Sequence, residues 1–260
     1  MNRDFWKIYS SLIDPIPATL RVKRGIQREK WTIVDSECGA GVAMTSASLP
    51  TESSHSLMGK SLKEVASWVT SWDFSKASFG MAAINSYWNQ RERVEQSFAS
   101  PLEDLAARES IENLLISRFR NQKVLFVGHF PFSDSLRSQC QVVVLERRKI
   151  TNTLPDTACE VLIPEQDAVV VTASSLVNKS FVRLSELCSG RFSLLLGPTT
   201  PLSPVLSLSG YSQISGIVPK DSQRLYELIE NGASREILGE EISWKVDIEF
   251  GHKSEHQSAL

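Results

Sequence analysis

The sequence contains few cysteines, and their spacing fits no common cysteine-rich module. Cys38, Cys140, Cys159 and Cys188 include no Cys-x-x-Cys pair, and no histidine lies at zinc-finger spacing from them. The chain therefore lacks the pattern of a zinc module and that of a disulfide framework. We interpret the four residues as reduced cytosolic thiols, most of them buried.

Long apolar runs and an excess of one charge are also missing. No stretch approaches the roughly 20 apolar residues needed to cross a bilayer, and the N-terminus lacks the apolar core of a signal peptide. The chain has 28 basic and 30 acidic residues, a net charge of -2, so it provides no overall field for holding a polyanion. We therefore expect a cytoplasmic protein that binds neither nucleic acid nor membrane.

The N-terminal third predicts a small α+β unit. Apolar residues recur at helical spacing near the start, and then alternate with polar residues as in strands. Ser61 and Glu64 have the spacing of a capping box for a helix that ends at Trp72. The predicted elements are a helix over 2–13, an antiparallel meander from strands at 19–24, 31–34 and after the glycine turn at 37–44, and helices over 61–72 and 76–89. Small residues in the last helix allow another backbone to approach closely.

A polar, charged stretch after Asn89 marks a change of organisation. We predict a small domain over 1–95, a linker over 96–104, a second domain over 105–250 and a flexible tail over 251–260. A helix is predicted over 102–119. His252 and His256 in the tail have i,i+4 spacing that would chelate a metal in a helix, but their polar surroundings favour disorder.

The second domain alternates apolar runs with helical patterns. Continuous apolar runs are typical of strands that are covered on both faces, as in a parallel sheet between helix layers. Strands are predicted at 124–127, 142–145, 168–172, 193–196 and 214–218, with an alternating edge strand at 242–248. Covering helices are predicted at 133–138, 156–163, 179–188, 204–209 and 222–231. The fold class is therefore α/β, a doubly wound, mostly parallel sheet preceded by the small α+β domain.

Loops that follow the predicted strands hold the candidate ligand groups, because open α/β sheets bind ligands outside the carboxyl ends of their strands. The first loop contains Gly128 and His129, and its single glycine is not the dinucleotide-binding fingerprint. His129 fits either a ligand of a metal or anion or a packed structural residue. Glu146 begins the second loop, where it fits a ribose-binding acid or a surface ion pair.

The third loop, 172–178, offers Thr172, Ser174 and Asn178 to phosphate or carboxylate oxygens. The same residue types would equally cap the helix that follows, and the two interpretations are compatible.

The fourth loop starts at Gly197 and contains three prolines before residue 205. Prolines fix φ and remove backbone donors, so this loop must be stiff. It holds Thr199, Thr200 and Ser203, which we interpret as ligand-binding hydroxyls.

In this order, the segments 128–132, 145–147, 154–158, 172–178 and 197–204 resemble the heavy-metal-chelation family known as domain of unknown function 364. The resemblance covers about residues 105 to 235. Upstream, segments 31–34, 39–43 and 80–85 resemble its companion, domain of unknown function 4213, which is similar in fold to the N-terminal domain of enolases. The resemblance implies a Rossmann-like second domain, a cleft between the domains, and a link to metals or metal chelates.

The resemblance also transfers candidate roles to particular residues. His129 and Glu146 become candidate ligands of a divalent metal ion, and Thr199 a candidate ligand contact. Asp156 fits either a ligand contact or a helix N-cap. Asn85 fits a residue facing the cleft or one that bonds a neighbouring backbone carbonyl.

Three functions are compatible with these features. The first is binding of a small anionic ligand, a metal or a metal chelate in the cleft between the domains. The second is an enzyme, a transferase or lyase acting on a carboxylate- or nucleotide-like substrate with His129 or Glu146 as acid or base, although no nucleophile and base pair is visible. The third is an assembly role for the small domain, and we expect a homodimer.

Overall fold

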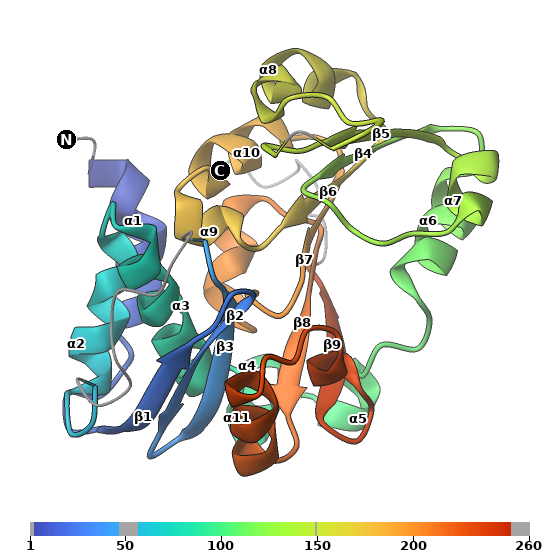
Figure 1. Ribbon diagram of the computed structural model, residues 1–260. Coiled ribbons are helices and arrows are strands. Elements are labelled where there is room, and N and C mark those ends of the chain that lie inside the picture. The colour runs from blue at the N-terminus through green and yellow to red at the C-terminus, as the bar shows by residue number, and fades with distance from the viewer. Residues whose placement is uncertain (1–2, 47–56, 149, 251–260) are drawn as a thin grey trace, which may run out of the picture.

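The computed structural model describes residues 3–46, 57–148 and 150–250, which form two sheets and the helices around them (Figure 1). The small antiparallel sheet has the order β1 (Val22–Gln27), β2 (Trp31–Ser36) and β3 (Gly39–Met44). The larger sheet has six strands in the order β5-β4-β6-β7-β8-β9. The expected α/β fold with a small α+β part is therefore confirmed.

The small sheet is preceded by α1 (Arg3–Ile13) and followed by α2 (Leu62–Ser67), a 3-10 turn (Trp68–Thr70) and α3 (Phe74–Trp88). Three local predictions differ from the structure here. The Ser61 side chain does not cap α2 but donates to the Ala18 carbonyl, and Ser61 itself bridges to Arg21. Trp72 lies beyond the helical turn and is 65% exposed. The first strand begins at Val22, three residues later than predicted. Arg21, just before it, forms the isolated bridge with Ser61.

Helix α3 is buried nearly all round, since 13 of its 15 residues are buried. Two glycines make this possible. A Cβ on Gly80 would lie 2.0 Å from the Val69 nitrogen, and a Cβ on Gly41 of β3 would lie 2.0 Å from the Ser86 nitrogen of α3. Any side chain at either position would overlap a backbone, which confirms the predicted close approach at this helix.

The polar stretch after Asn89, which includes the linker predicted over 96–104, is mostly helical. It forms α4 (Arg91–Phe98) and α5 (Leu102–Leu105). The predicted long helix over 102–119 is broken, because Ala106 bridges to Val246 and the Ala107 amide donates to the Lys245 carbonyl. These contacts hold the chain extended until α6 (Ile111–Phe119) begins.

All six predicted strands of the large sheet are confirmed. The parallel strands are β4 (Lys123–Val127), β5 (Gln141–Leu145), β6 (Ala168–Thr172), β7 (Phe192–Leu196) and β8 (Gln213–Pro219), and β9 (Ser243–Glu249) runs antiparallel to β8 at the edge. Because β5 and β6 lie on opposite sides of β4, the direction of winding reverses between β4 and β6. Doubly wound sheets bind ligands at the carboxyl ends of the strands that flank such a reversal.

Helices cover both faces of the large sheet (Figure 1). On one face, Leu115 of α6 and Leu136 of α7 (Asp134–Gln139) pack on Phe126. The other face carries α8 (Cys159–Leu162), α9 (Ser175–Asn178), α10 (Phe181–Leu187) and the 3-10 helix Pro204–Ser209. Shorter 3-10 turns occupy Asp156–Ala158, Ile163–Glu165 and Glu236–Leu238. All four cysteines are free; Cys140 and Cys188 are buried, and Cys38 and Cys159 are partly buried.

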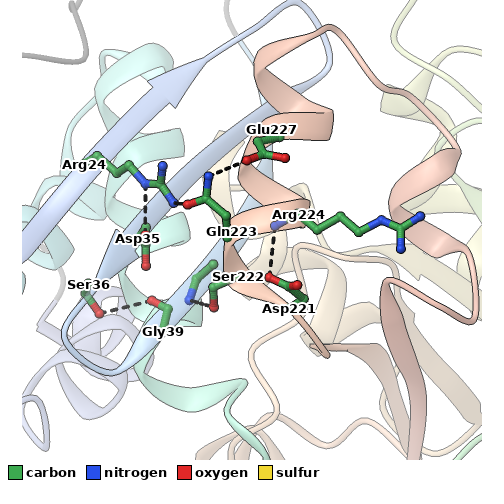
Figure 2. A network of polar contacts seen from close by, with 10 residues as sticks. Arg24, Asp35, Ser36, Gly39, Asp221, Ser222, Gln223, Arg224 and Glu227 are labelled. Carbon is green, nitrogen blue, oxygen red and sulfur yellow. Dashed lines mark hydrogen bonds and ion pairs between the residues drawn. The ribbon is translucent and has the colours of Figure 1, made fainter.

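The two sheets share their core. Helix α11 (Ser222–Glu230) packs Leu225 and Ile229 against Ile33 and Val42 on the face of the small sheet opposite to α3. Figure 2 shows the polar side of this contact, where Arg24 pairs with Asp35 at 3.0 Å and also bonds Gln223 of α11. Strand β2 is consequently buried along its whole length.

Candidate functional site

Three residues predicted from the strand-end loops meet where the winding reverses. Gly128 leaves β4 with φ 104°, and a Cβ there would lie 2.8 Å from the Thr172 methyl group. Both the positive φ and this contact require glycine. The hydroxyls of Thr172 and Ser174 lie 3.0 Å apart. Gly128, Thr172 and Ser174 therefore form one group at the carboxyl ends of β4 and β6.

Gly197 extends this edge to the next strand. It leaves β7 with φ 124°, and its amide donates to the Ser215 carbonyl at 3.0 Å. A Cβ at Gly197 would meet no described atom within 4 Å, so the loop starts beside open space. We call Gly128, Thr172, Ser174 and Gly197 the strand-edge site.

His129 and Glu146 lie on the loops beside this edge. His129 is exposed and makes no hydrogen bond or ion pair with a described residue. Glu146 accepts from the Arg148 amide at 3.0 Å and pairs with its guanidinium at 3.6 Å, as in the surface ion pair considered above. Within residues 3–46, 57–148 and 150–250, no three His, Cys, Asp or Glu side chains gather closely enough to hold a metal ion. His252 and His256 lie outside the described residues.

Asp156 and Asn178 serve local structure. Asp156 was predicted as either a helix N-cap or a ligand contact. It does not cap the helical turn but is its first residue, and its carboxylate pairs with Arg147 at 2.8 Å. The Asn178 side chain accepts from the Ser180 amide and hydroxyl at 3.1 and 2.6 Å, which fixes the turn into α10. Neither contact brings these two residues to the strand-edge site.

The proline-rich loop lies in the seam between the two sheets. Thr199, Thr200 and Ser203 are buried. The Thr199 hydroxyl accepts from the Met44 amide of β3 at 2.8 Å, and the Ser203 hydroxyl accepts from the Val205 amide at 3.3 Å. Their polar groups are thus directed into the protein, and a role in ligand contact stays a prediction.

Two asparagines of α3 hold this loop. Asn85 donates to the carbonyls of Val42 at 2.8 Å and Thr199 at 3.0 Å, which is the backbone-bonding alternative considered for it. Asn89, one helical turn later, donates to the carbonyls of Thr200 and Ile217 and accepts from the Leu202 amide, at 2.9, 3.1 and 2.8 Å. The i,i+4 spacing of the two asparagines is a sequence signal that would have pointed to Asn89.

Lys179 is a second residue that sequence reasoning missed. It directly follows α9 with φ 70°, is 5% exposed, and donates to the Val177 carbonyl at 2.6 Å. The rings of Tyr9 and Phe74 lie 5.8 Å away, and no described carboxylate pairs with the ammonium. Burial lowers the pKa of Lys179 from 10.5 to about 8. Nothing in the local sequence distinguishes it from a surface lysine.

We expect Asn89→Ala to lower the free energy of unfolding by about 3 kcal/mol or more, because it leaves three buried backbone groups without partners. Asn231→Ala is the matched control, since Asn231 also caps a helix but is exposed and donates only to the Glu227 carbonyl. Its loss should cost less than about 1 kcal/mol. Urea denaturation compares the two variants, and equal losses would contradict the role assigned to Asn89.

We expect Lys179→Met to stabilise the protein at neutral pH. The folded pKa of about 8 lies below the unfolded value of 10.5, so burial of the charge costs stability at neutral pH, and this cost disappears as pH rises through that interval. The gain should be about 1 to 3 kcal/mol near pH 7 and should vanish near pH 10. Urea denaturation at both pH values, with the exposed Lys245→Met as control, would refute this if the gain were absent or independent of pH.

Comparisons with known proteins identify the family. The family model of DUF364, described as "Putative heavy-metal chelation", matches residues 112–246, and DUF4213, with the same description, matches residues 9–88. No curated protein matches the chain. Among the described residues, no helix has both the length and the apolar composition needed to cross a bilayer.

Two solved structures are similar over nearly the whole chain. A DUF364 protein of unknown function from Desulfitobacterium hafniense is 29% identical, with a TM-score of 0.82, and the match covers 95% of this chain and 99% of that one. Another from Pyrococcus horikoshii, 20% identical with a TM-score of 0.75 and the same coverage, shows likeness of fold. Because the DUF364 model matches more than half of the chain, the protein belongs to the DUF364 family.

Proposed function

We propose that the protein binds a small anionic ligand, in particular an anionic metal chelate, at the strand-edge site. The observation that carries the proposal is the hydroxyl pair of Thr172 and Ser174 at the carboxyl end of β6. The strands on either side, β4 and β7, are each followed by a positive-φ glycine, Gly128 and Gly197. Hydroxyls donate hydrogen bonds to anionic oxygens, and glycines let such a ligand approach the backbone. The location agrees with the general rule for doubly wound sheets.

A chelate fits the donor set better than a bare metal ion does. A protein site for a transition metal needs several imidazole, thiolate or carboxylate ligands, and the described residues bring no three of them together. A chelate supplies the metal's ligands itself and presents anionic oxygens to the protein.

The test compares citrate, its ferric complex and Ni²⁺ alone by calorimetry. We expect the two citrate species to bind, and the Thr172→Val, Ser174→Ala double variant to weaken them at least about tenfold, since each lost hydrogen bond to a charged group is worth about 1.5 kcal/mol or more. Ser138→Ala is the control, because that hydroxyl is exposed on α7 and donates to the Ser135 carbonyl.

Binding of Ni²⁺ alone with neither citrate species would contradict the proposal. So would citrate binding that the double variant leaves unchanged, because the ligand would then lie away from the strand-edge site.

A further inference from the structure

A separate pocket lies in the seam, at the carboxyl end of β8. Its volume is about 350 Å³, within the range of small-molecule sites. The β2–β3 turn, the starts of α4 and α11, and strand β9 all contribute to its walls. The lining residues used in the argument below are Gly39, Gln90, Arg91, Lys220, Ser222 and Trp244. None of the residues predicted from the strand-end loops lines it, so we call it the seam pocket.

We propose that the seam pocket binds a second small ligand, one that carries a phosphate or carboxylate group on an apolar body. The charged side chains in its lining are Arg91, Lys220 and Glu92. Because Glu95 and Glu103 pair with Arg91, Lys220 is the lining cation that no described carboxylate neutralises. Val218, Pro219 and Trp244 provide an apolar wall beside these cations. Pockets that combine an apolar wall with a few converging polar groups are typical of ligand sites.

The two cations are held in place and keep unused donors. Lys220 donates to the Glu240 carbonyl and lies 4.0 Å from the centre of the Trp244 ring, so two of its three ammonium protons remain. Arg91 binds Glu95 through Nε and Glu103 through one Nη atom, which leaves three of its five donors. A charge that is already oriented loses less side-chain entropy when a ligand binds.

Neutral groups in the pocket add to this set of donors. The Ser222 hydroxyl accepts from the Ala40 amide at 3.0 Å (Figure 2), which leaves its proton for another acceptor. Gln90 precedes α4 without capping it, because its amide nitrogen donates to the carbonyls of Ala40 and Ser86. The first amides of α4 therefore have no side-chain acceptor among the described residues, in a wall that already holds two cations.

A ligand here would contact both parts of the chain. Gly39 and Gln90 belong to the N-terminal part, while Lys220, Ser222 and Trp244 belong to the part that builds the large sheet. Binding should therefore raise the stability of the whole chain by mass action. It should also be independent of the strand-edge site, whose residues do not line the seam pocket.

The probes are phenyl phosphate and inorganic phosphate, titrated into the full chain by calorimetry and followed by tryptophan fluorescence. We expect phenyl phosphate to bind more tightly than inorganic phosphate, and its fluorescence change to disappear in Trp244→Phe. Lys220→Met should weaken phenyl phosphate at least about tenfold, the value of a lost charged hydrogen bond. Lys245→Met, an exposed lysine of β9 outside the pocket, should leave its affinity unchanged.

Three results would overturn the proposal. Phenyl phosphate could fail to bind the wild-type chain, or Lys220→Met and Lys245→Met could weaken it equally, which would indicate attraction by surface charge alone. The Thr172→Val, Ser174→Ala variant could also abolish binding, which would place the probe at the strand-edge site. Thermal denaturation of each variant without ligand shows whether its fold is intact.

Discussion

Asn85 and Asn89 of α3 bond backbone groups of both sheets and of the proline-rich loop inside the buried seam, so they hold these three parts together. Each side-chain amide donates to carbonyls that are buried away from water. A buried carbonyl left without a donor would cost roughly 1 to 3 kcal/mol. The bonds fix the rotation of α3 about its axis, because both residues must face the proline-rich loop. Gly41 and Gly80 let α3 lie close enough for these bonds to form.

This arrangement also positions the strand-edge site. The loop held by the asparagines begins at Gly197, directly after β7. The asparagine bonds therefore hold the backbone next to the strand-edge site. Thr199 adds a bond to β3, which ties the end of the small sheet to the same loop. The prolines restrict the unfolded loop as well, which lowers the entropy lost on folding. The stiffness predicted for this loop thus supports the packing of the two parts of the chain.

The sequence predicted the large sheet well, because strands covered on both faces must be continuously apolar. Its failures occur where long-range contacts decide the structure. Ser61 has the pattern of a capping residue. Its hydroxyl donates to the Ala18 carbonyl instead, and its backbone forms a β-bridge with Arg21. The break after Leu105 comes from pairing with β9, more than a hundred residues away in sequence. The polar stretch after Asn89 forms α4 and α5, because exposed helices need few apolar residues.

The candidate site was predicted only in part, for a similar reason. Strand-end loops can be located from sequence, so Gly128, Thr172 and Ser174 could be grouped before the structure was known. Whether a hydroxyl faces a ligand or the protein depends on what packs against it, and Thr199 and Ser203 face the protein. The seam pocket draws its residues from distant segments, none with a distinctive pattern. Lys179 differs from other lysines only through its burial.

Native-state hydrogen exchange in increasing urea tests most directly whether the seam makes one cooperative body of the two sheets. The account predicts that amides of β2 and β3 open with the same free energy as amides of β4, β6 and β7, and that this value equals the global free energy of unfolding. Exchange of the small sheet at a clearly lower free energy, while the large sheet stays protected, would contradict it.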